Sequence, residues 1–450
     1  MKQKAFIICS TIVLTLMMPL VACNQETPNS NNGNTTSEVE VPPKPDFDVK
    51  INLDEVEGEF DTHTETQNGY LNDSYENIDK YGKGSSENSK PNSLNLSWSI
   101  TDSELDITSV LLTIKAEGEE EIVYQLDKDA TSMNVTNLLI GKNYTWTVTA
   151  VAGDKSVSNS SFFSTKDGIV RFISIDGLSN VRDCGGWTGL YGKKIKQGLL
   201  YRGEEFNKQN NGRSGSGSTG VYDPSKVSPD DPYGQKISET GINTVTNELK
   251  IKTEVDIRGY ETFDWETRVN YAPTECGGLV GALPDGSVDP EKGVVGIIDE
   301  VDYVICPVHT NRDKIYYDEY GHAACKNFFS MLADETRLPL YFHCAQGKDR
   351  TGFLAYLFEA FLGCSDEEMM RDYLLSNMGK TGSVSISKLV GSSANYNYVD
   401  FLDGKEVSTS SGVKYTAEGD TIAERAYNYL LECGLTRSQL DNIRATFLED

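Results

Sequence analysis

The chain has 450 residues, 38% of them hydrophobic, and is therefore long enough for two or three domains with packed cores. Its formal net charge at pH 7 is −27. Such an acidic chain repels nucleic acids and anionic lipid surfaces at long range, which argues against a nucleic-acid-binding role. A phosphorylated ligand would have to be captured by a local basic pocket.

The N-terminal segment has the pattern of an export signal. Lys2 and Lys4 precede an apolar run, and residues 20–23 read Leu-Val-Ala-Cys, which resembles a bacterial lipobox. The run is too short and too one-sided for a permanent membrane span. We expect residues 1–22 to be a signal peptide, with an uncleaved anchor helix as the alternative. Lipidation of Cys23 would anchor the exported protein to a bacterial membrane, at the outer membrane or cell surface rather than in the cytoplasm.

Residues 23–89 lack the pattern of a folded domain. Residues 24–45 are rich in Asn, Thr, Glu and Pro and contain too few apolar side chains to fold. Residues 47–89 stay polar, with scattered aromatic side chains. We interpret this part of the chain as a tether followed by an unassigned polar segment.

Period-two alternation of apolar and polar residues predicts an all-β unit over residues 90–167. The alternation is clear in residues 94–98 and 144–150, which are typical of short strands. Residues 138–144, Leu-Leu-Ile-Gly-Lys-Asn-Tyr, resemble the tyrosine-corner turn of fibronectin type III domains, and the early Trp98 fits the same pattern. The resemblance implies a β-sandwich, for which we favour the role of a spacer.

The stretch from Tyr341 to Gly352 reads YFHCAQGKDRTG and lies between two apolar runs. Residues 338–342 are short and apolar, as in a buried strand, whereas residues 353–358 have the bulk of a buried helix. The loop between them therefore opens a helix. Its N–H groups would have no intrahelical partner and the helix dipole is positive there, so the amides of residues 345–350 would hold an anion above Cys344.

The same loop supplies a nucleophile and a cation. A free cysteine titrates near pH ~8.5, and a helix N-terminus with an adjacent cation lowers that pKa to roughly 3.5–7.5, so Cys344 would be a competent nucleophile at neutral pH. Arg350 carries a planar fork that clamps two phosphoryl oxygens. Around this pair, the residues predicted to bind substrate are His343, Ala345, Gln346, Gly347, Lys348, Thr351 and, from an earlier strand, Arg202.

Spacing alone is weak evidence for this site, because Cys306 and Arg312 repeat the Cys-x5-Arg pattern. That second copy lacks the glycine of the loop, the Thr-Gly pair after the arginine and a directly following apolar helix. All of these features occur together at Cys344. The sequence therefore favours Cys344 as the catalytic cysteine over a buried structural one.

A metal-binding alternative involves four other residues. Cys306 and His309, with His322 and Cys325, have the ligand types and spacing of a zinc site. His322 and Cys325 fall in an apparent helix whose aromatic residues suggest core packing, so we favour packing over zinc. Metal analysis of the purified protein would separate the two.

Residues 343–352 resemble the HCxxGxxR[ST] signature of cysteine-dependent phosphatases in the protein-tyrosine-phosphatase superfamily. The ending GKDRTG is similar to a bacterial branch of tyrosine, dual-specificity and phosphoinositide phosphatases. Further blocks resemble family blocks in family order: residues 179–186 (NFRDxGG), 198–202 (the following strand), 253–261 (DLRxxxE) and 372–377 (DYLxSN). In the third of these blocks we expect Arg258 to pair with Glu261.

The resemblance and the alternation of strand and helix patterns imply an α/β phosphatase domain over residues 168–450, with a mostly parallel sheet flanked by helices, preceded by the all-β fibronectin III-like sandwich. The expected strands are at 244 or 254–257, at 303–306 and at 338–343. The expected helices are at 320–334 and 350–362, the latter ended by Gly363, and two more follow capping boxes at Ser365 and Thr436. Insertions at 208–236, 272–297 and 379–419 are candidates for shaping the mouth of the pocket.

The resemblance implies in-line attack by Cys344 on phosphorus, giving a phosphocysteine that water cleaves, with no metal or other cofactor. Arg350 and the loop amides would stabilise the charge on the equatorial oxygens. Thr351 would donate a hydrogen bond to the thiolate and help sulfur to leave in the second step.

The proton donor to the leaving oxygen is left open by the sequence. Most relatives supply an aspartate from a WPD loop, and this chain has no such tripeptide. We rank Asp349 first and Asp313 second, and His309 lies in roughly the same place as Asp313. Asp349 has an alternative interpretation as an acceptor for backbone N–H groups of the loop.

Lys348 bears on the substrate, because relatives that accept phosphoinositides carry a lysine at this position. We predict a phosphotyrosine peptide as the first substrate and a phosphoinositide as the second. The alternatives are an inositol polyphosphate phosphatase and a surface lipoprotein that binds zinc or a phosphorylated ligand without catalysis. The predicted partners are thus the substrate and, through Cys23, the membrane, with no nucleic acid.

Overall fold

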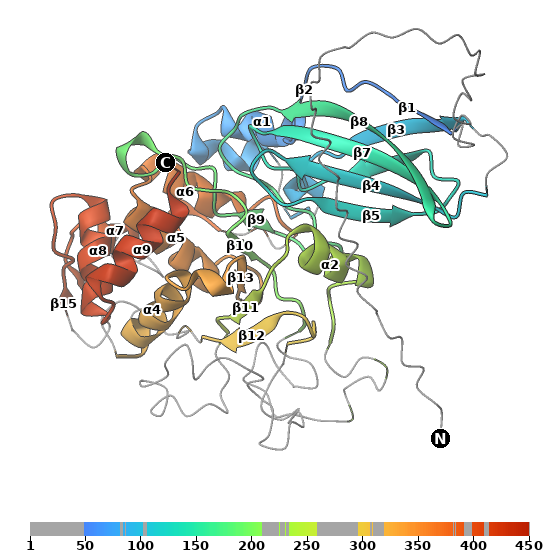
Figure 1. Ribbon diagram of the computed structural model, residues 1–450. Helices are drawn as coiled ribbons and strands as arrows, with labels where there is room; N and C mark the ends of the chain where they lie inside the picture. Colours follow the sequence, from blue (N-terminus) through green and yellow to red (C-terminus); the bar gives the residue numbers. More distant parts are fainter. Residues whose placement is uncertain are drawn as a thin grey trace, which may run out of the picture. The chain divides into compact units, whose positions relative to one another are not determined.

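The computed structural model describes residues 49–81, 84, 85, 87–101, 106–208, 225, 230, 234–258, 296–306, 308, 319–380, 382, 384–390, 398–408 and 414–449. The described residues belong to one compact unit, Asp48–Asp450 (Figure 1). The predicted signal peptide, Cys23 and the predicted tether at residues 24–45 lie outside the described residues. Among the helices of the described part, none is long and apolar enough to cross a membrane.

The first part of the unit is a sandwich of two sheets, with strand orders β1-β3-β6 and β2-β8-β7-β4-β5. The strands are β1 (Lys50–Leu53), β2 (Glu59–Phe60), β3 (Leu94–Thr101), β4 (Ser109–Ala116), β5 (Ile122–Leu126), β6 (Ser132–Val135), β7 (Asn143–Ala152) and β8 (Lys155–Thr165). Alternation along β7 buries Tyr144, Trp146 and Val148. The Leu139 N–H donates to the Tyr144 hydroxyl at 2.6 Å, which confirms the predicted tyrosine corner.

The described residues between 49 and 89 are folded, although the sequence left residues 47–89 unassigned. β1 pairs with β3 and β2 pairs with β8, so both strands extend the sandwich. The other elements are α1 (Glu65–Leu71) and the 3₁₀ helices η1 (Tyr75–Lys80) and η2 (Glu87–Ser89). Tyr70 and Ile78 are buried in the core of the second part, and Arg371 donates to the Tyr70 carbonyl oxygen at 2.7 Å. These anchors are too few to give a periodic pattern, so the sequence alone left the segment unassigned.

The second part is built on a five-stranded sheet in the order β12-β11-β13-β10-β9. Its strands are β9 (Arg182–Asp183), β10 (Leu200–Gly203), β11 (Thr253–Asp256), β12 (Asp302–Ile305) and β13 (Leu340–His343). The last four run parallel, and β9 pairs antiparallel with β10. Of the two places predicted for one strand, β11 takes the later. Residue 244 instead begins the π-helix η6 (Thr244–Glu248), which continues helix α2 (Glu239–Asn243).

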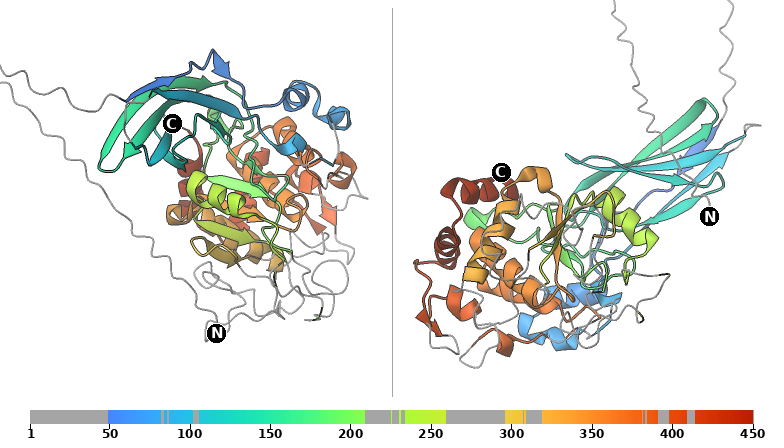
Figure 2. Two further views of the ribbon diagram at one scale, coloured as in Figure 1. Left: turned by 90° about the vertical axis from the view of Figure 1, so that its right-hand side faces the viewer. Right: turned by 90° about the horizontal axis from the view of Figure 1, so that it is seen from below.

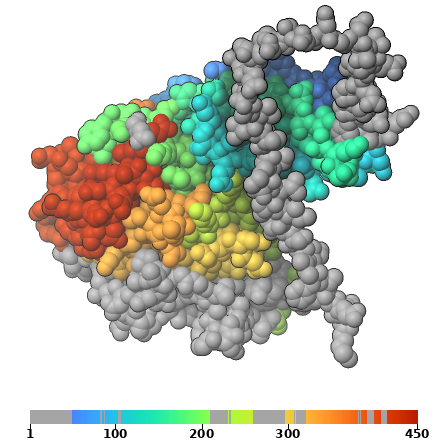
Figure 3. Space-filling view, in the orientation of Figure 1, coloured from blue at the N-terminus to red at the C-terminus, as the bar shows by residue number. Residues whose placement is uncertain are grey.

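Helical segments pack on both faces of this sheet (Figure 2). The main helices are α4 (Glu319–Leu332), α5 (Arg350–Leu362), α6 (Asp366–Leu375), α7 (Tyr398–Leu402), α8 (Ile422–Glu432) and α9 (Arg437–Phe447). Because side chains alternate along a strand, Leu340 and Phe342 of β13 share a core with α5, whereas Tyr341 packs with Tyr201 and Val245 on the other face. The C-terminal helices occupy one continuous region of the surface beside α4 (Figure 3).

Several local predictions are confirmed. Helix α5 covers the predicted residues and ends at Gly363, whose φ of 86° is the left-handed conformation that glycine adopts without strain. Ser365 and Thr436 form the predicted capping boxes. The first two predicted insertions lie largely outside the described residues. The third predicted insertion includes η10 (Ile386–Lys388), α7, β14 (Val407–Ser408) and β15 (Lys414–Tyr415). Two short 3₁₀ helices lie elsewhere in the chain, η3 (Leu190–Gly192) and η9 (Glu335–Arg337).

Candidate active site

The predicted loop connects the central strand β13 to the buried helix α5. Cys344 follows the last residue of β13 and is 4% exposed, and Arg350 is the first residue of α5. Between them Gly347 has a φ of 66°, and a Cβ atom there would lie 2.3 Å from the Gly203 carbonyl oxygen. Only glycine fits this turn, so the loop curls tightly over the end of the sheet.

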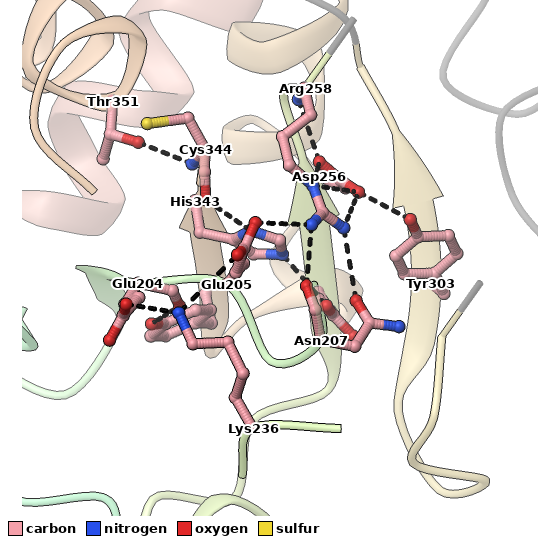
Figure 4. A network of polar contacts seen from close by, with 12 residues as sticks. Glu204, Glu205, Asn207, Lys236, Asp256, Arg258, Tyr303, His343, Cys344 and Thr351 are labelled. Atoms are coloured by element: carbon pink, nitrogen blue, oxygen red, sulfur yellow. Dashed lines mark hydrogen bonds and ion pairs between the residues drawn. The ribbon is translucent and has the colours of Figure 1, made fainter. Parts of the chain in front are cut away.

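The surroundings of Cys344 favour its thiolate. Burial alone would raise the pKa of the thiol, because the charged form loses hydration. The charge of Arg350, the Thr351 hydroxyl and the N–H groups of Thr351 and Gln346 outweigh burial, so the pKa of Cys344 lies below its ordinary value. Thr351 Oγ1 accepts from the Cys344 N–H at 2.8 Å, which leaves the hydroxyl hydrogen to donate to sulfur (Figure 4).

The guanidinium group of Arg350 has a hydrogen-bond donor that the described residues do not satisfy. Its Nη1 atom is buried and has no hydrogen-bond partner among the described residues. A buried guanidinium nitrogen without an acceptor is costly, and a bound oxyanion would satisfy it. Together with the positive end of α5, this group gives the start of the helix the donors and charge that an oxyanion such as a phosphoryl group requires.

His343 supports the loop from inside the protein, which differs from the predicted contact with substrate. The ring is fully buried and its Nδ1 lies 3.0 Å from the Cys344 carbonyl oxygen, so Nδ1 carries the hydrogen. Nε2 lies 2.9 Å from Glu254 Oε1. Burial raises the pKa of Glu254, and for His343 the effect of Glu254 and Asp256 outweighs burial and raises the pKa of the imidazole.

Arg258 anchors a second buried network beside His343 (Figure 4). The predicted partner, Glu261, lies outside the described residues. Arg258 Nε donates to both carboxylate oxygens of Asp256, at 2.8 and 2.9 Å, and Nη1 donates to Glu205 at 2.7 Å. The Tyr303 hydroxyl donates to Asp256 at 2.7 Å. Further partners in this network are Asn207, which accepts from Arg258, and Lys236, which pairs with Glu204 and Glu205.

Arg202 also lies behind the loop, which differs from the predicted contact with substrate. Its side chain is fully buried, and Nη2 donates to the Gly347 carbonyl oxygen at 3.1 Å. Nη1 donates to Asp372 at 2.5 Å. The sequence missed the neighbouring role of Asn180, which donates to the same carbonyl at 3.2 Å. Its presence in the NFRDxGG-like block was the only signal.

Lys348 and Asp349 lie at the rim of the predicted anion site. Lys348 is 8% exposed, and burial lowers the pKa of its ammonium, an effect to which Lys388 adds and which Asp349 opposes. Asp349 occupies the N-cap position of α5, but its side chain makes no capping hydrogen bond. The interpretation of Asp349 as a backbone acceptor therefore gains no support from the described residues. Asp313 and His309 lie outside them.

The alternative zinc ligands have other neighbours where they are described. The Cys306 thiol donates to the Ala324 carbonyl oxygen at 3.5 Å, and Cys325 Sγ lies 3.5 Å from the Tyr429 hydroxyl. The His322 ring also packs on Tyr429. The structure, over the residues it describes, brings together no group of three potential ligands. His309 lies outside that part, so the zinc site stays an untested alternative.

Comparison with known proteins agrees with this geometry. The model of the tyrosine phosphatase family matches residues 173–214 and 234–449, and the model of the fibronectin type III domain matches residues 83–164. A Cupriavidus necator protein named as a candidate tyrosine-protein phosphatase is 26% identical over 207 residues, which are 46% of this chain and 63% of that protein. The match thus spans less than two thirds of the relative's length.

A solved structure of a redesigned β-sandwich protein is also similar. It shares 21% sequence identity, the match covers 16% of this chain and 81% of that one, and the TM-score is 0.14, which is too low to support an argument about the fold. The match to the tyrosine phosphatase family model covers more than half of the 450 residues and includes the whole loop from Cys344 to Arg350. The chain belongs to the tyrosine phosphatase family.

Proposed function

We propose that the protein is a cysteine-dependent phosphatase that hydrolyses phosphomonoesters through a phosphocysteine. The observation that supports this most is the pairing of Cys344, whose thiol has a lowered pKa, with the unpartnered Nη1 of Arg350 at the start of α5. A thiolate and an anion-binding helix terminus in one loop are what phosphoryl transfer to sulfur requires. Family membership supports the same reaction.

In the first step the Cys344 thiolate attacks phosphorus in line with the ester oxygen. The S–P bond forms as the P–O bond breaks, and Asp349 in its acid form gives its proton to the leaving oxygen. Water then attacks the phosphocysteine and gives a proton to Asp349. The S–P bond breaks, inorganic phosphate leaves, and the thiolate is restored while Thr351 donates to it.

The substrate we favour is a phosphotyrosine residue in a protein. The sulfur of Cys344 is buried, so a long, flat phosphotyrosine side chain reaches it more readily than a short phosphoserine does. Phosphoinositides are the second candidate, because Lys348 and Lys388 add positive charge beside the loop. An inositol polyphosphate would use the same cations, but the charge of −27 on the chain disfavours a highly charged ligand.

Phosphate release from a panel of substrates tests both levels of the proposal. The panel contains phosphotyrosine and phosphoserine peptides, monophosphorylated phosphoinositides and phytate, with wild-type protein and Lys348→Ala. We expect the highest kcat/KM for phosphotyrosine. Losing one charge-assisted contact costs about 1.5–3 kcal/mol, so Lys348→Ala should shift the preference away from phosphoinositides by roughly tenfold or more. An equal loss for every substrate would make Lys348 a general loop residue, and no release from any of them would reject the phosphatase.

We also propose that the mature protein is exported and anchored through Cys23. The support is the lipobox-like Leu-Val-Ala-Cys at residues 20–23 behind a short apolar run. Fractionation of cells that express wild-type and Cys23→Ser protein tests this. The wild type should sediment with membranes and the variant should not, whereas equal distribution would reject lipid anchoring.

A further inference from the structure

The carbonyl side of the loop carries contacts that the proposed reaction does not use. Asn180 Nδ2 donates to the carbonyl oxygens of Gln346 and Gly347, at 3.1 and 3.2 Å. Arg202 Nη2 donates to the same Gly347 oxygen at 3.1 Å. Asn180 is 3% exposed, so these bonds form in the protein interior, behind the face that would receive the phosphoryl group.

The direction of these two carbonyls decides the direction of two amides. A trans peptide unit is planar, and its C=O and N–H point in opposite directions. When the Gln346 carbonyl points back toward Asn180, the N–H of Gly347 points forward. When the Gly347 carbonyl points back, the N–H of Lys348 points forward. Two donors for an equatorial phosphoryl oxygen are therefore aimed by bonds made on the opposite side of the loop.

Asn180 is itself fixed in the orientation that this role needs. Its Oδ1 accepts from Arg182 Nη1 at 2.7 Å, and since arginine only donates, the NH₂ group must face the loop. Arg182 is held in turn by Asp372, to which its Nε donates at 2.7 Å. The backbone of Asn180 has a φ of 58°, a left-handed conformation that asparagine tolerates, and its N–H donates to Ser89 Oγ at 3.4 Å.

We propose that Asn180 is a positioning residue for the phosphatase reaction, which keeps the N–H groups of Gly347 and Lys348 turned toward the phosphoryl group. It does not touch the substrate and acts through the two carbonyls that it binds. The inference rests on the proposed function. It predicts that loss of the Nδ2 donor disturbs binding of a tetrahedral anion and activation of Cys344, beyond any general loss of stability.

Two variants with different risks test this role. Asn180→Asp keeps the size, the tolerance for positive φ and the acceptor for Arg182, but removes both N–H donors. Asn180→Gly keeps the backbone conformation without strain and removes the side chain, which avoids the added carboxylate. The matched control is Asn137→Asp, because Asn137 has the same φ of 58° and its Nδ2 donates to a carbonyl, that of Ser174, at 3.0 Å.

Three quantities are measured on each variant: kcat/KM for a phosphotyrosine peptide, the Kd of tungstate, and the pH midpoint of Cys344 alkylation by iodoacetamide. We expect both Asn180 variants to lose about 10–100-fold in kcat/KM, to bind tungstate more weakly and to shift the alkylation midpoint to higher pH. Asn137→Asp should lower only the melting temperature.

The proposal is overturned if both Asn180 variants keep the kcat/KM and tungstate affinity of the wild type. It is also overturned if Asn137→Asp changes these quantities equally, because the effect would then be one of general stability. Absence of phosphatase activity in the wild type would reject the proposed reaction instead, and the tungstate and alkylation measurements would still report on the direction of the amides.

Discussion

Two buried cysteines that each directly follow a strand of the central sheet differ in the acidity of their thiols. Cys344 follows β13 and Cys184 follows β9, and their exposures are 4% and 0%. The pKa of Cys344 is lowered because Arg350, Thr351 and loop amides outweigh burial. The pKa of Cys184 is raised well above its ordinary value, because burial is reinforced by the carboxylates of Asp372 and Asp183 and only partly offset by Arg202.

The contrast separates burial from local charge. Both thiols lose their hydration, which disfavours the thiolate in each place. What differs is the sign of the nearest charges: Cys344 lies beside Arg350 at the positive N-terminus of α5, whereas the carboxylates of Asp372 and Asp183 lie near Cys184. The pKa of a buried thiol in this protein therefore depends on the charges and hydrogen-bond donors of the surrounding loop.

Replacing each cysteine by serine should separate the two places most strongly. Cys344→Ser removes the proposed nucleophile, and we expect kcat to fall on the order of 10⁴–10⁶-fold while tungstate still binds, since the amides remain. Cys184→Ser should keep most of the wild-type activity per folded molecule. Steady-state kinetics on both variants checks this. An equal loss of kcat in the two variants would contradict a specific catalytic role for Cys344.

Replacing Arg350 by lysine keeps the charge that lowers the pKa of Cys344 but removes the planar fork. We expect kcat/KM to fall by about 10²–10³-fold, because the transition state would lose the bidentate donor proposed for Arg350. Arg337→Lys, at a partly exposed ion pair with Asp334 outside the loop, is the matched control and should leave kcat/KM unchanged. Kinetics that leave Arg350→Lys within threefold of wild type would show that charge alone is enough.

The proposed general acid gives a smaller effect that depends on the leaving group. Asp349→Asn should slow hydrolysis of phenyl phosphate by about 10²-fold and that of p-nitrophenyl phosphate much less, because the nitrophenolate leaves without a proton. An equal loss of rate for both esters would contradict Asp349 as the general acid and would favour Asp313.

The smallest effect is expected at Glu359 of α5, an acidic side chain that is fully buried near Cys184. Burial, with Asp372 nearby, raises the pKa of Glu359 well above its ordinary value, so the folded state holds a proton that the unfolded state releases. Stability of the wild type therefore falls as pH rises above the unfolded pKa, and glutamine has no such titration. Glu359→Gln should be relatively more stable at pH 7 than at pH 5, by about 1 kcal/mol, as measured by urea unfolding. The same difference at both pH values would contradict a protonated Glu359.

The sequence was most informative where a feature is local. Helix α5, its end at Gly363 and the capping boxes at Ser365 and Thr436 depend on residues within one or two turns, and all were predicted. The loop from Cys344 to Arg350 was identified for the same reason, because its residues are consecutive.

Features that depend on distant partners were not predictable from one sequence. Asn180 reaches the loop across 166 positions of sequence, and Tyr70 meets Arg371 across 301. His343 and Arg202 were expected to touch the substrate because they belong to blocks that resemble phosphatase motifs, whereas both are buried and contact a carboxylate and a carbonyl. No periodicity encodes such contacts, since they are set by which strands lie side by side.

The most direct test of the central claim is to trap the enzyme during turnover. Wild-type protein is mixed with a phosphotyrosine peptide, quenched in acid within milliseconds, digested and examined by mass spectrometry. Attack by the Cys344 thiolate predicts a phosphoryl group on the peptide that contains Cys344 and none on the peptide that contains Cys184. Turnover with an unmodified Cys344, or with the phosphoryl group on another residue, would contradict it.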